Sequence, residues 1–184
     1  MLKFATALIA LGLAAAPLAA QSPAQSGAFA AGPVFTDFGE VASVETTMAI
    51  PADTAFAVAF DTATRADVGE INRTLNSAAR FINMHVAAGV PRENIRVAVV
   101  VHGRASLDLT RSAFYAEHQE GAENANAMAI EALLANNVEI ILCGQTAAYY
   151  EIGVADLLPG VDMALSAMTA HALLQQDGYT VNPF

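Results

Sequence analysis

Two residues in this sequence are suited to chemistry by type and position: a cysteine and a histidine, each following a largely apolar run. Cys143, the only cysteine, comes directly after residues 138–142, and His102 comes directly after residues 95–101. Both runs are typical of buried strands. Ligands of open parallel α/β sheets bind beyond the carboxyl ends of the strands. If the two strands are neighbours, the thiol and the imidazole emerge at the same edge of the sheet.

The segment after the cysteine favours an activated thiol. Residues 145–149 could begin a helix, and a sulfur at a helix N-terminus has a lowered pKa and a larger thiolate fraction. We therefore take Cys143 and His102 as candidate catalytic residues, with Gly103, Gly144, Gln145 and Asn124 as candidate ligand-binding residues. The competing interpretations are a buried, inert cysteine and a histidine that only hydrogen-bonds a loop carbonyl. Position alone leaves these alternatives open.

The sequence lacks the motifs that usually accompany several other kinds of chemistry. The sequence has no Cys-x-x-Cys or His-x-x-x-His spacing, so we expect no dedicated metal site. It has no Gly-x-Gly-x-x-Gly, P-loop lysine or Gly-x-Ser-x-Gly elbow, so we expect no cofactor and no serine hydrolase. Of the other histidines, His85 is expected near a helix end at the surface and His118 in a polar loop. His171 shares a helix face with Ala167 and Leu174, which indicates packing.

The elements that must position these residues alternate between strands and helices. The pattern predicts strands over residues 55–60, 95–101, 138–142, 161–165 and 179–181. It predicts helices over residues 71–86, from an Asn124 cap to residue 135, and over 166–176, with a long polar loop at 102–123. Such alternation indicates an α/β fold: a single domain with a mostly parallel sheet of about five strands and helices on both faces.

The first residues are typical of a signal peptide. Lys3 precedes an apolar stretch and small residues up to Ala20, so we expect a signal peptide at 1–20 and a periplasmic or secreted protein. The alternative is an uncleaved membrane anchor, but the apolar run is short for a spanning helix. A flexible lead-in and extended arm over 21–53 and an α/β domain over 54–184 follow. We expect no stable membrane insertion after cleavage.

Net charge and cysteine usage limit the classes of partner that we expect for the protein. Removing residues 1–20 removes the only lysine and leaves 7 arginines against 18 acidic residues, a net charge of −11. Such a surface repels nucleic acid, which we exclude as a partner. A lone cysteine in an exported protein cannot form an internal disulfide, which makes it a candidate for a reactive or an intermolecular thiol.

An ordered set of segments resembles the DsrE/DsrF-like (YchN-like) family, specifically its exported members. The resemblance lies in residues 32–39, 97–103, 136–145, 156–161 and 175–179. It implies a parallel-sheet α/β domain that assembles into trimers or hexamers. Some members carry sulfur as a persulfide on a cysteine, and Cys143 falls at the matching position. The sequence departs from the sulfur relay proteins, whose cysteine is commonly followed by an Arg-Gly pair, because here residues 149–153 read Tyr-Tyr-Glu-Ile-Gly.

Three functional hypotheses follow. In the first, the protein is a periplasmic sulfur carrier or transferase: Cys143 holds sulfane sulfur as a persulfide and yields it to another thiol, with His102 as a positive neighbour or proton carrier. Its partner would be a thiol-bearing protein or a small sulfur compound. In the second, the protein is a non-catalytic binding or assembly module with a structural cysteine. In the third, it is a thiol redox sensor.

Overall fold

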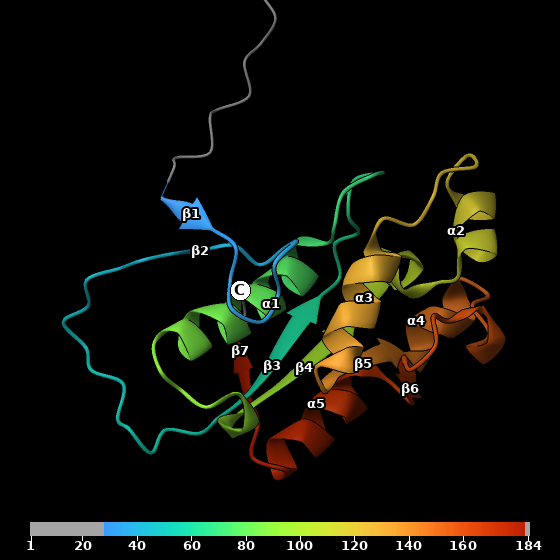
Figure 1. Ribbon diagram of the computed structural model, residues 1–184. Helices are drawn as coiled ribbons and strands as arrows, with labels where there is room; N and C mark the ends of the chain where they lie inside the picture. Colours follow the sequence, from blue (N-terminus) through green and yellow to red (C-terminus); the bar gives the residue numbers. More distant parts are fainter. Residues whose placement is uncertain (1–27, 183–184) are drawn as a thin grey trace, which may run out of the picture.

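The computed structural model describes residues 28–182, and its centre is a five-stranded sheet in which every pairing is parallel (Figure 1). The strand order is β6-β5-β4-β3-β7. The strands are β3 (Phe56–Thr62), β4 (Ile95–Val101), β5 (Val138–Cys143), β6 (Asp162–Ala164) and β7 (Thr180–Asn182). The predicted α/β class, with a parallel sheet of five strands, is confirmed.

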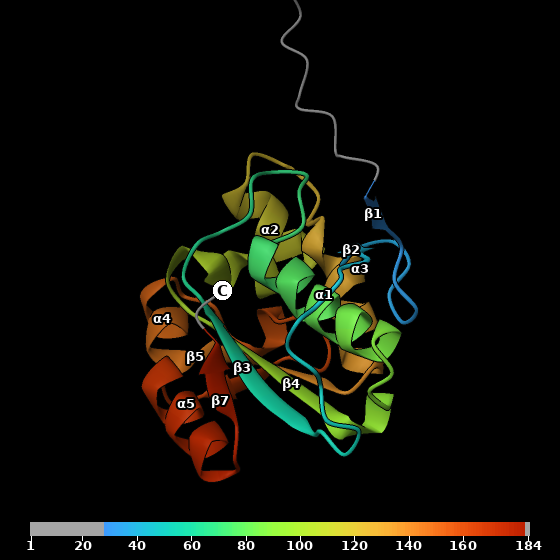
Figure 2. The ribbon, with the colours of Figure 1, turned by 90° about the vertical axis from the view of Figure 1, so that its left-hand side faces the viewer.

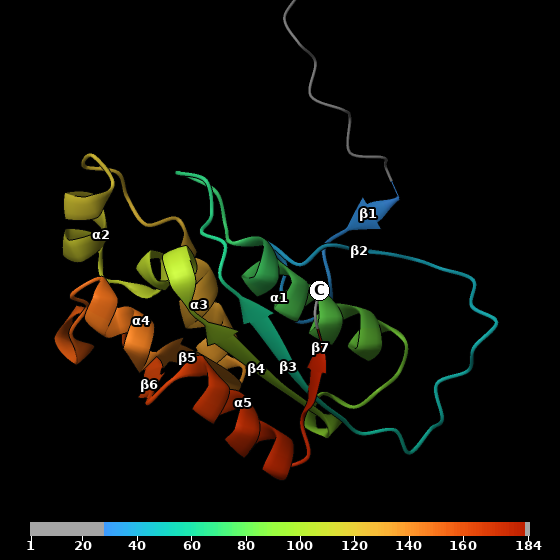
Figure 3. The same cartoon turned by 180° about the vertical axis from the view of Figure 1, so that it is seen from behind.

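Helices cover both faces of this sheet, as Figures 2 and 3 show from two sides. On one face, α1 (Arg73–Ala87) packs on β3 and β4, and α3 (Asn126–Ala135) packs on β5. On the other face, α5 (Ala167–Gln176) packs on β4 and β5. Two shorter helices, α2 (Ser112–His118) and α4 (Gly144–Tyr149), lie outside these layers. Three 3₁₀ helices complete the connections: Arg92–Asn94, Gly103–Leu109 and Val154–Asp156.

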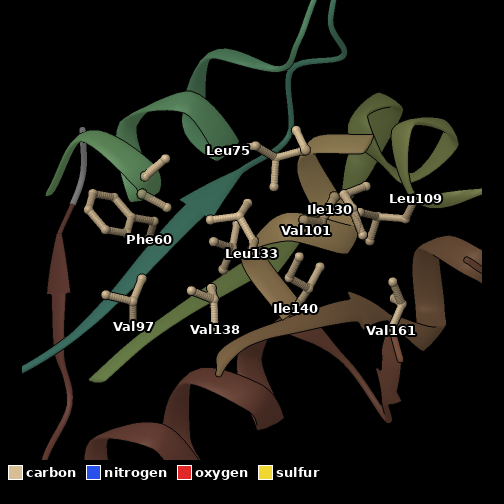
Figure 4. Packing of buried hydrophobic residues seen from close by; sticks show 14 of the residues in the cluster. Phe60, Leu75, Val97, Val101, Leu109, Ile130, Leu133, Val138, Ile140 and Val161 are labelled. Carbon is tan, nitrogen blue, oxygen red and sulfur yellow. The ribbon is translucent and has the colours of Figure 1, made fainter. Parts of the chain in front are cut away.

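Alternation along the strands gives the two faces different packing. The face toward α1 and α3 carries large side chains that form the main core, among them Phe60, Val97 and Ile140 (Figure 4). The face toward α5 carries smaller ones, including Ala59 and Ala98. Small residues such as these let a helix approach the sheet closely.

The lead-in before the sheet is more ordered over its described part than its composition predicts. β1 (Phe29–Ala30) pairs antiparallel with β2 (Val41–Ala42). Between them, Phe35 and Phe38 are buried in the main core. The side chain of Asn83 on α1 hydrogen-bonds the backbone of Val34, Phe35 and Gly39. These hydrogen bonds hold the arm on α1, although in the sequence Asn83 is only a polar residue within a helical pattern.

Two predictions about the middle of the chain are corrected. The polar segment 102–123 contains the 3₁₀ helix Gly103–Leu109 and α2, because Leu109 and Tyr115 supply buried contacts that a polar composition hides. α3 begins at Asn126 rather than directly after Asn124, although the Asn124 side chain does accept a hydrogen bond from the Asn126 amide.

The predicted signal peptide lies outside the described residues. Within residues 28–182, no helix combines the length and apolar character that a membrane span requires.

Candidate functional site

Cys143 is the last residue of β5 and stands immediately before α4. The residue is 6% exposed. Burial raises the pKa of its thiol, but hydrogen bonds from the Thr146 hydroxyl and from the amides of Thr146, Ala167 and Gln145 outweigh that effect. The net pKa of the thiol is below its ordinary value. The site thus favours a sulfur anion at a place where burial alone would disfavour one.

Gly144 makes this convergence of donors possible. A Cβ atom at Gly144 would lie 2.6 Å from the carbonyl oxygen of Ala164, a distance that side chains do not tolerate. The chain after β5 therefore passes close to the chain after β6. That approach brings the first amide of α5, at Ala167, to the sulfur that ends β5.

Thr146 links the cysteine to the end of β4. Its hydroxyl oxygen accepts a hydrogen bond from the Gly103 amide at 3.3 Å, which leaves its proton free for the Cys143 sulfur. Gly103 has a φ of 54°, in the left-handed region that glycine adopts without strain. The turn after β4 thus orients the hydroxyl group that acts on the thiol.

His102 lies beside this site but is bonded to another group. Its Nε2 atom lies 3.0 Å from Oδ2 of Asp61, the residue near the end of β3. The other oxygen of the same carboxylate, Oδ1, lies 2.7 Å from Nε2 of His171 on α5. Burial raises the pKa of Asp61, but the hydrogen bonds with His171 and His102 lower it by more. The net pKa of Asp61 is therefore below its ordinary value.

The remaining candidate residues are distributed as follows. Gly103 and Gly144 shape the turns beside Cys143, and Gln145 supplies an amide to its sulfur while its own side chain donates to the Leu165 carbonyl at 3.2 Å. Asn124 is buried, and its amide group bonds the carbonyls of Asp108 and Thr110. Its hydrogen bonds are therefore made inside the protein.

Sequence reasoning missed four contributors to the site. Asp61 directly follows the strand predicted over residues 55–60 and was given no role, and His171 was assigned to packing. Thr146 and Ala167 were not singled out. Asp61 carried one usable signal, because it follows a strand of the same parallel sheet and so had to lie at the edge that holds His102. The position of His171 depends on how α5 crosses the sheet.

A buried carboxyl group lies in a separate polar network. Asp108 is 1% exposed, and its Oδ2 atom accepts hydrogen bonds from the Ala66 amide at 2.9 Å and the Asn72 side chain at 2.7 Å. Its Oδ1 atom has no partner among the described residues. Burial outweighs these bonds and the nearby Arg65, and it raises the pKa of Asp108 to about 6.

Among residues 28–182, no three His, Cys, Asp or Glu side chains are arranged to hold a metal ion.

Fold and site together define a parallel α/β protein with a thiol at the carboxyl edge of its sheet. The chain belongs to the DsrE/DsrF-like family, whose model matches residues 55–183. Membership of this family is consistent with a sulfur-related role.

Two solved structures resemble the chain at low identity. A protein of unknown function from Methanobacterium thermoautotrophicum, MTH1491, is 19% identical over 72% of this chain and 100% of its own, with a TM-score of 0.46. The ychN protein from E. coli is 19% identical over 71% of this chain and 99% of its own, with a TM-score of 0.48. The sequence has no significant match among curated proteins.

Proposed function

We propose that the protein is a sulfur carrier of the periplasm, in which Cys143 holds sulfane sulfur as a persulfide and passes it to a second thiol. The observation that carries this proposal is the set of donors around the sulfur: one hydroxyl group and three backbone amides lower the pKa of a thiol that is 6% exposed. A structural cysteine needs no such donors, whereas a thiolate or persulfide anion does.

Two exchange steps describe the reaction. In loading, the Cys143 thiolate attacks the terminal sulfur of a polysulfide, the sulfur–sulfur bond behind that atom breaks, and the shortened polysulfide leaves as an anion. In unloading, the thiolate of an acceptor attacks the outer sulfur of the Cys143 persulfide, and Cys143 leaves as a thiolate. Sulfane sulfur moves as one atom in each step, and no external oxidant or reductant is required.

The low exposure of Cys143 sets a preference among reagents. Because Cys143 as a residue is only 6% exposed, we expect slender donors, such as inorganic polysulfide, to reach its sulfur more readily than bulky aromatic disulfides. The Arg-Gly pair of the relay proteins is absent, and neutral donors from Thr146, Gln145 and Ala167 stand in its place. Export and assembly into trimers or hexamers are further parts of the proposal, supported by residues 1–20 and by the family resemblance respectively.

The test is intact mass spectrometry of the mature protein after incubation with polysulfide, beside the Cys143→Ser variant. We expect the parent protein to gain the mass of sulfur and to lose it on reduction, while the variant gains none. Transfer to an added thiol, measured as a new persulfide on that thiol, completes the assay. Sulfur carriage is excluded if the parent protein stays unmodified, or if the parent and the variant gain the same mass.

Burial of Cys143 favours one alternative, a non-catalytic binding or assembly module. Exposed apolar side chains on nearby elements, Tyr149, Leu165 and Met168, are of the kind found in subunit contacts. Under this alternative, Cys143 resists alkylation until the protein is denatured, and Cys143→Ser leaves assembly unchanged. A redox sensor would instead form a covalent dimer under oxidant on a non-reducing gel.

A further inference from the structure

We propose that His102, Asp61 and His171 form a proton-accepting cluster that takes the proton of an acceptor thiol while sulfur leaves Cys143, with Asp61 as the positioning residue for both imidazoles. This inference rests on the proposed sulfur carriage and adds to it the residues that unload the sulfur. It is carried by the position of the cluster beside Cys143, by its hydrogen bonds and by one unpartnered nitrogen.

The cluster and the thiol lie at one edge and on one face of the sheet. Val101 pairs with Leu142, so the next residues, His102 and Cys143, lie at adjacent positions about 4.8 Å apart, the usual spacing between strands. Both lie on the face toward α5, because side chains alternate along a strand and Val100 and Ile141, two positions earlier, pack against that helix. Figures 2 and 3 show α5 along this face of the sheet.

α5 contributes to both parts of the site. Its first residue, Ala167, donates its amide to the Cys143 sulfur, and His171 lies one turn later on the same side of the helix. The bond between His171 and Asp61 therefore ties this end of α5 to β3 while Ala167 binds the sulfur at β5.

The hydrogen bonds fix which nitrogens can accept a proton. An ionised carboxylate only accepts, so each imidazole must present its Nε2 proton to Asp61. The Nδ1 atoms then remain as bases. Nδ1 of His171 is buried and has no hydrogen-bond partner among the described residues, an arrangement that costs stability and leaves this nitrogen without a structural role. The His102 side chain is 34% exposed, so an incoming thiol reaches this ring first.

The charged groups around the cluster are few. Within the sheet and α5, the groups that act on the Asp61 carboxylate are the two imidazoles. The segment after β3 lines a cavity of about 640 Å³ together with Asp61. Its charged members are Arg65, Asp67, Glu70 and Arg73. Two of them are basic and two are acidic.

The proposed step couples a proton transfer to the transfer of sulfur. A neutral acceptor thiol gives its proton to Nδ1 of His102, and the resulting thiolate attacks the outer sulfur of the Cys143 persulfide anion. The bond between the Cys143 sulfur and the outer sulfur breaks. The products are the acceptor persulfide anion and the Cys143 thiolate. The imidazolium, paired with the Asp61 carboxylate, then returns its proton to solvent.

The experiment measures unloading from the sulfur-loaded parent protein and from Asp61→Asn and His171→Gln, at about pH 6.5 and about pH 9.5. Two acceptors are compared: glutathione, which ionises only near the ordinary thiol pKa of about 8.5, and 2-nitro-5-thiobenzoate, which is already a thiolate at both pH values. Asp177→Asn is the matched control, because Asp177 also accepts a side-chain hydrogen bond, from Arg96 at 2.6 Å, but at the exposed far end of α5.

We expect both variants to transfer sulfur to glutathione at least about 10-fold more slowly than the parent protein at pH 6.5, since general-base catalysis contributes about 10²–10⁴-fold. The deficit should vanish at pH 9.5 and be absent with 2-nitro-5-thiobenzoate, while Asp177→Asn follows the parent protein throughout. Equal slowing at both pH values and with both acceptors, or no slowing, overturns the inference. If the parent protein never loads, the proposed function itself fails, a separate result measured before unloading begins.

Discussion

The buried carboxyl group of Asp108 should make the stability of the fold depend on pH. Its pKa is raised from 3.8 to about 6 by burial in the 3₁₀ helix Gly103–Leu109. An acid whose pKa is higher in the folded state than in the unfolded chain binds its proton more tightly when folded. Stability is therefore full below about pH 4 and falls as pH rises through 6. A shift of about two units corresponds to a total loss of about 3 kcal/mol.

The substitution Asp108→Asn isolates this effect, because asparagine does not titrate and its oxygen can still accept from Ala66 and Asn72. Integrating the linkage between about pH 5 and about pH 8 gives a loss of about 1.4 kcal/mol for the parent protein from this group. The free energy of unfolding of Asp108→Asn, relative to that of the parent protein, should therefore rise by about 1.4 kcal/mol between these pH values. Any fixed cost of the new amide cancels in this comparison.

Urea unfolding of both proteins, followed by circular dichroism at the two pH values, provides the measurement. Asp67→Asn is the control, because Asp67 directly follows Ala66, whose amide donates to Asp108, but is itself exposed, and this variant should follow the parent protein at both pH values. If Asp108→Asn shows the same pH dependence as the parent protein, burial does not raise the pKa of this carboxyl group, and the reasoning is refuted.

Three further predictions concern the thiol and its supports. Thr146→Val removes a donor that lowers the pKa of Cys143, so the pH profile of Cys143 alkylation should move to higher pH, whereas Thr146→Ser should keep the parental profile. Asn83→Ala removes four hydrogen bonds to the arm and should lower the free energy of unfolding by about 2–5 kcal/mol, with faster proteolysis of residues 32–40. Gly144→Ala forces a Cβ against the Ala164 carbonyl and should cost about 1–3 kcal/mol in urea unfolding; unchanged stability would contradict the close approach.

Local sequence was sufficient for the elements with strong patterns. The strand over residues 95–101 is confirmed at both ends, because its valines suit a strand buried on both faces. The position of Cys143 at the end of a strand also follows from the sequence, since an apolar run ends there. Because the sheet is parallel, the carboxyl ends of its strands then lie at one edge.

What could not be predicted depends on contacts between distant residues. The assignment of His171 to packing was incomplete, because its partner Asp61 is 110 residues away and lies on another strand. The role foreseen for His102 as a neighbour of the thiol omitted Asp61 for the same reason. Asn124 was predicted to cap a helix and to contact a ligand. Its side-chain amide instead donates to the carbonyls of Asp108 and Thr110, in a segment whose path the sequence does not reveal.

The pairing of β3 with β7 has a consequence for the order of folding. Val58 pairs with Thr180, the most remote pairing in the described sheet, so it should form late, after the local β3-α1-β4 unit has closed. Until then the outer edge of β3 is an open seven-residue strand rich in alanine and phenylalanine, a template for association with other chains. Pairing with the three residues of β7 then covers part of this edge, so the interval before β7 docks is the one in which the folding chain is most prone to aggregation.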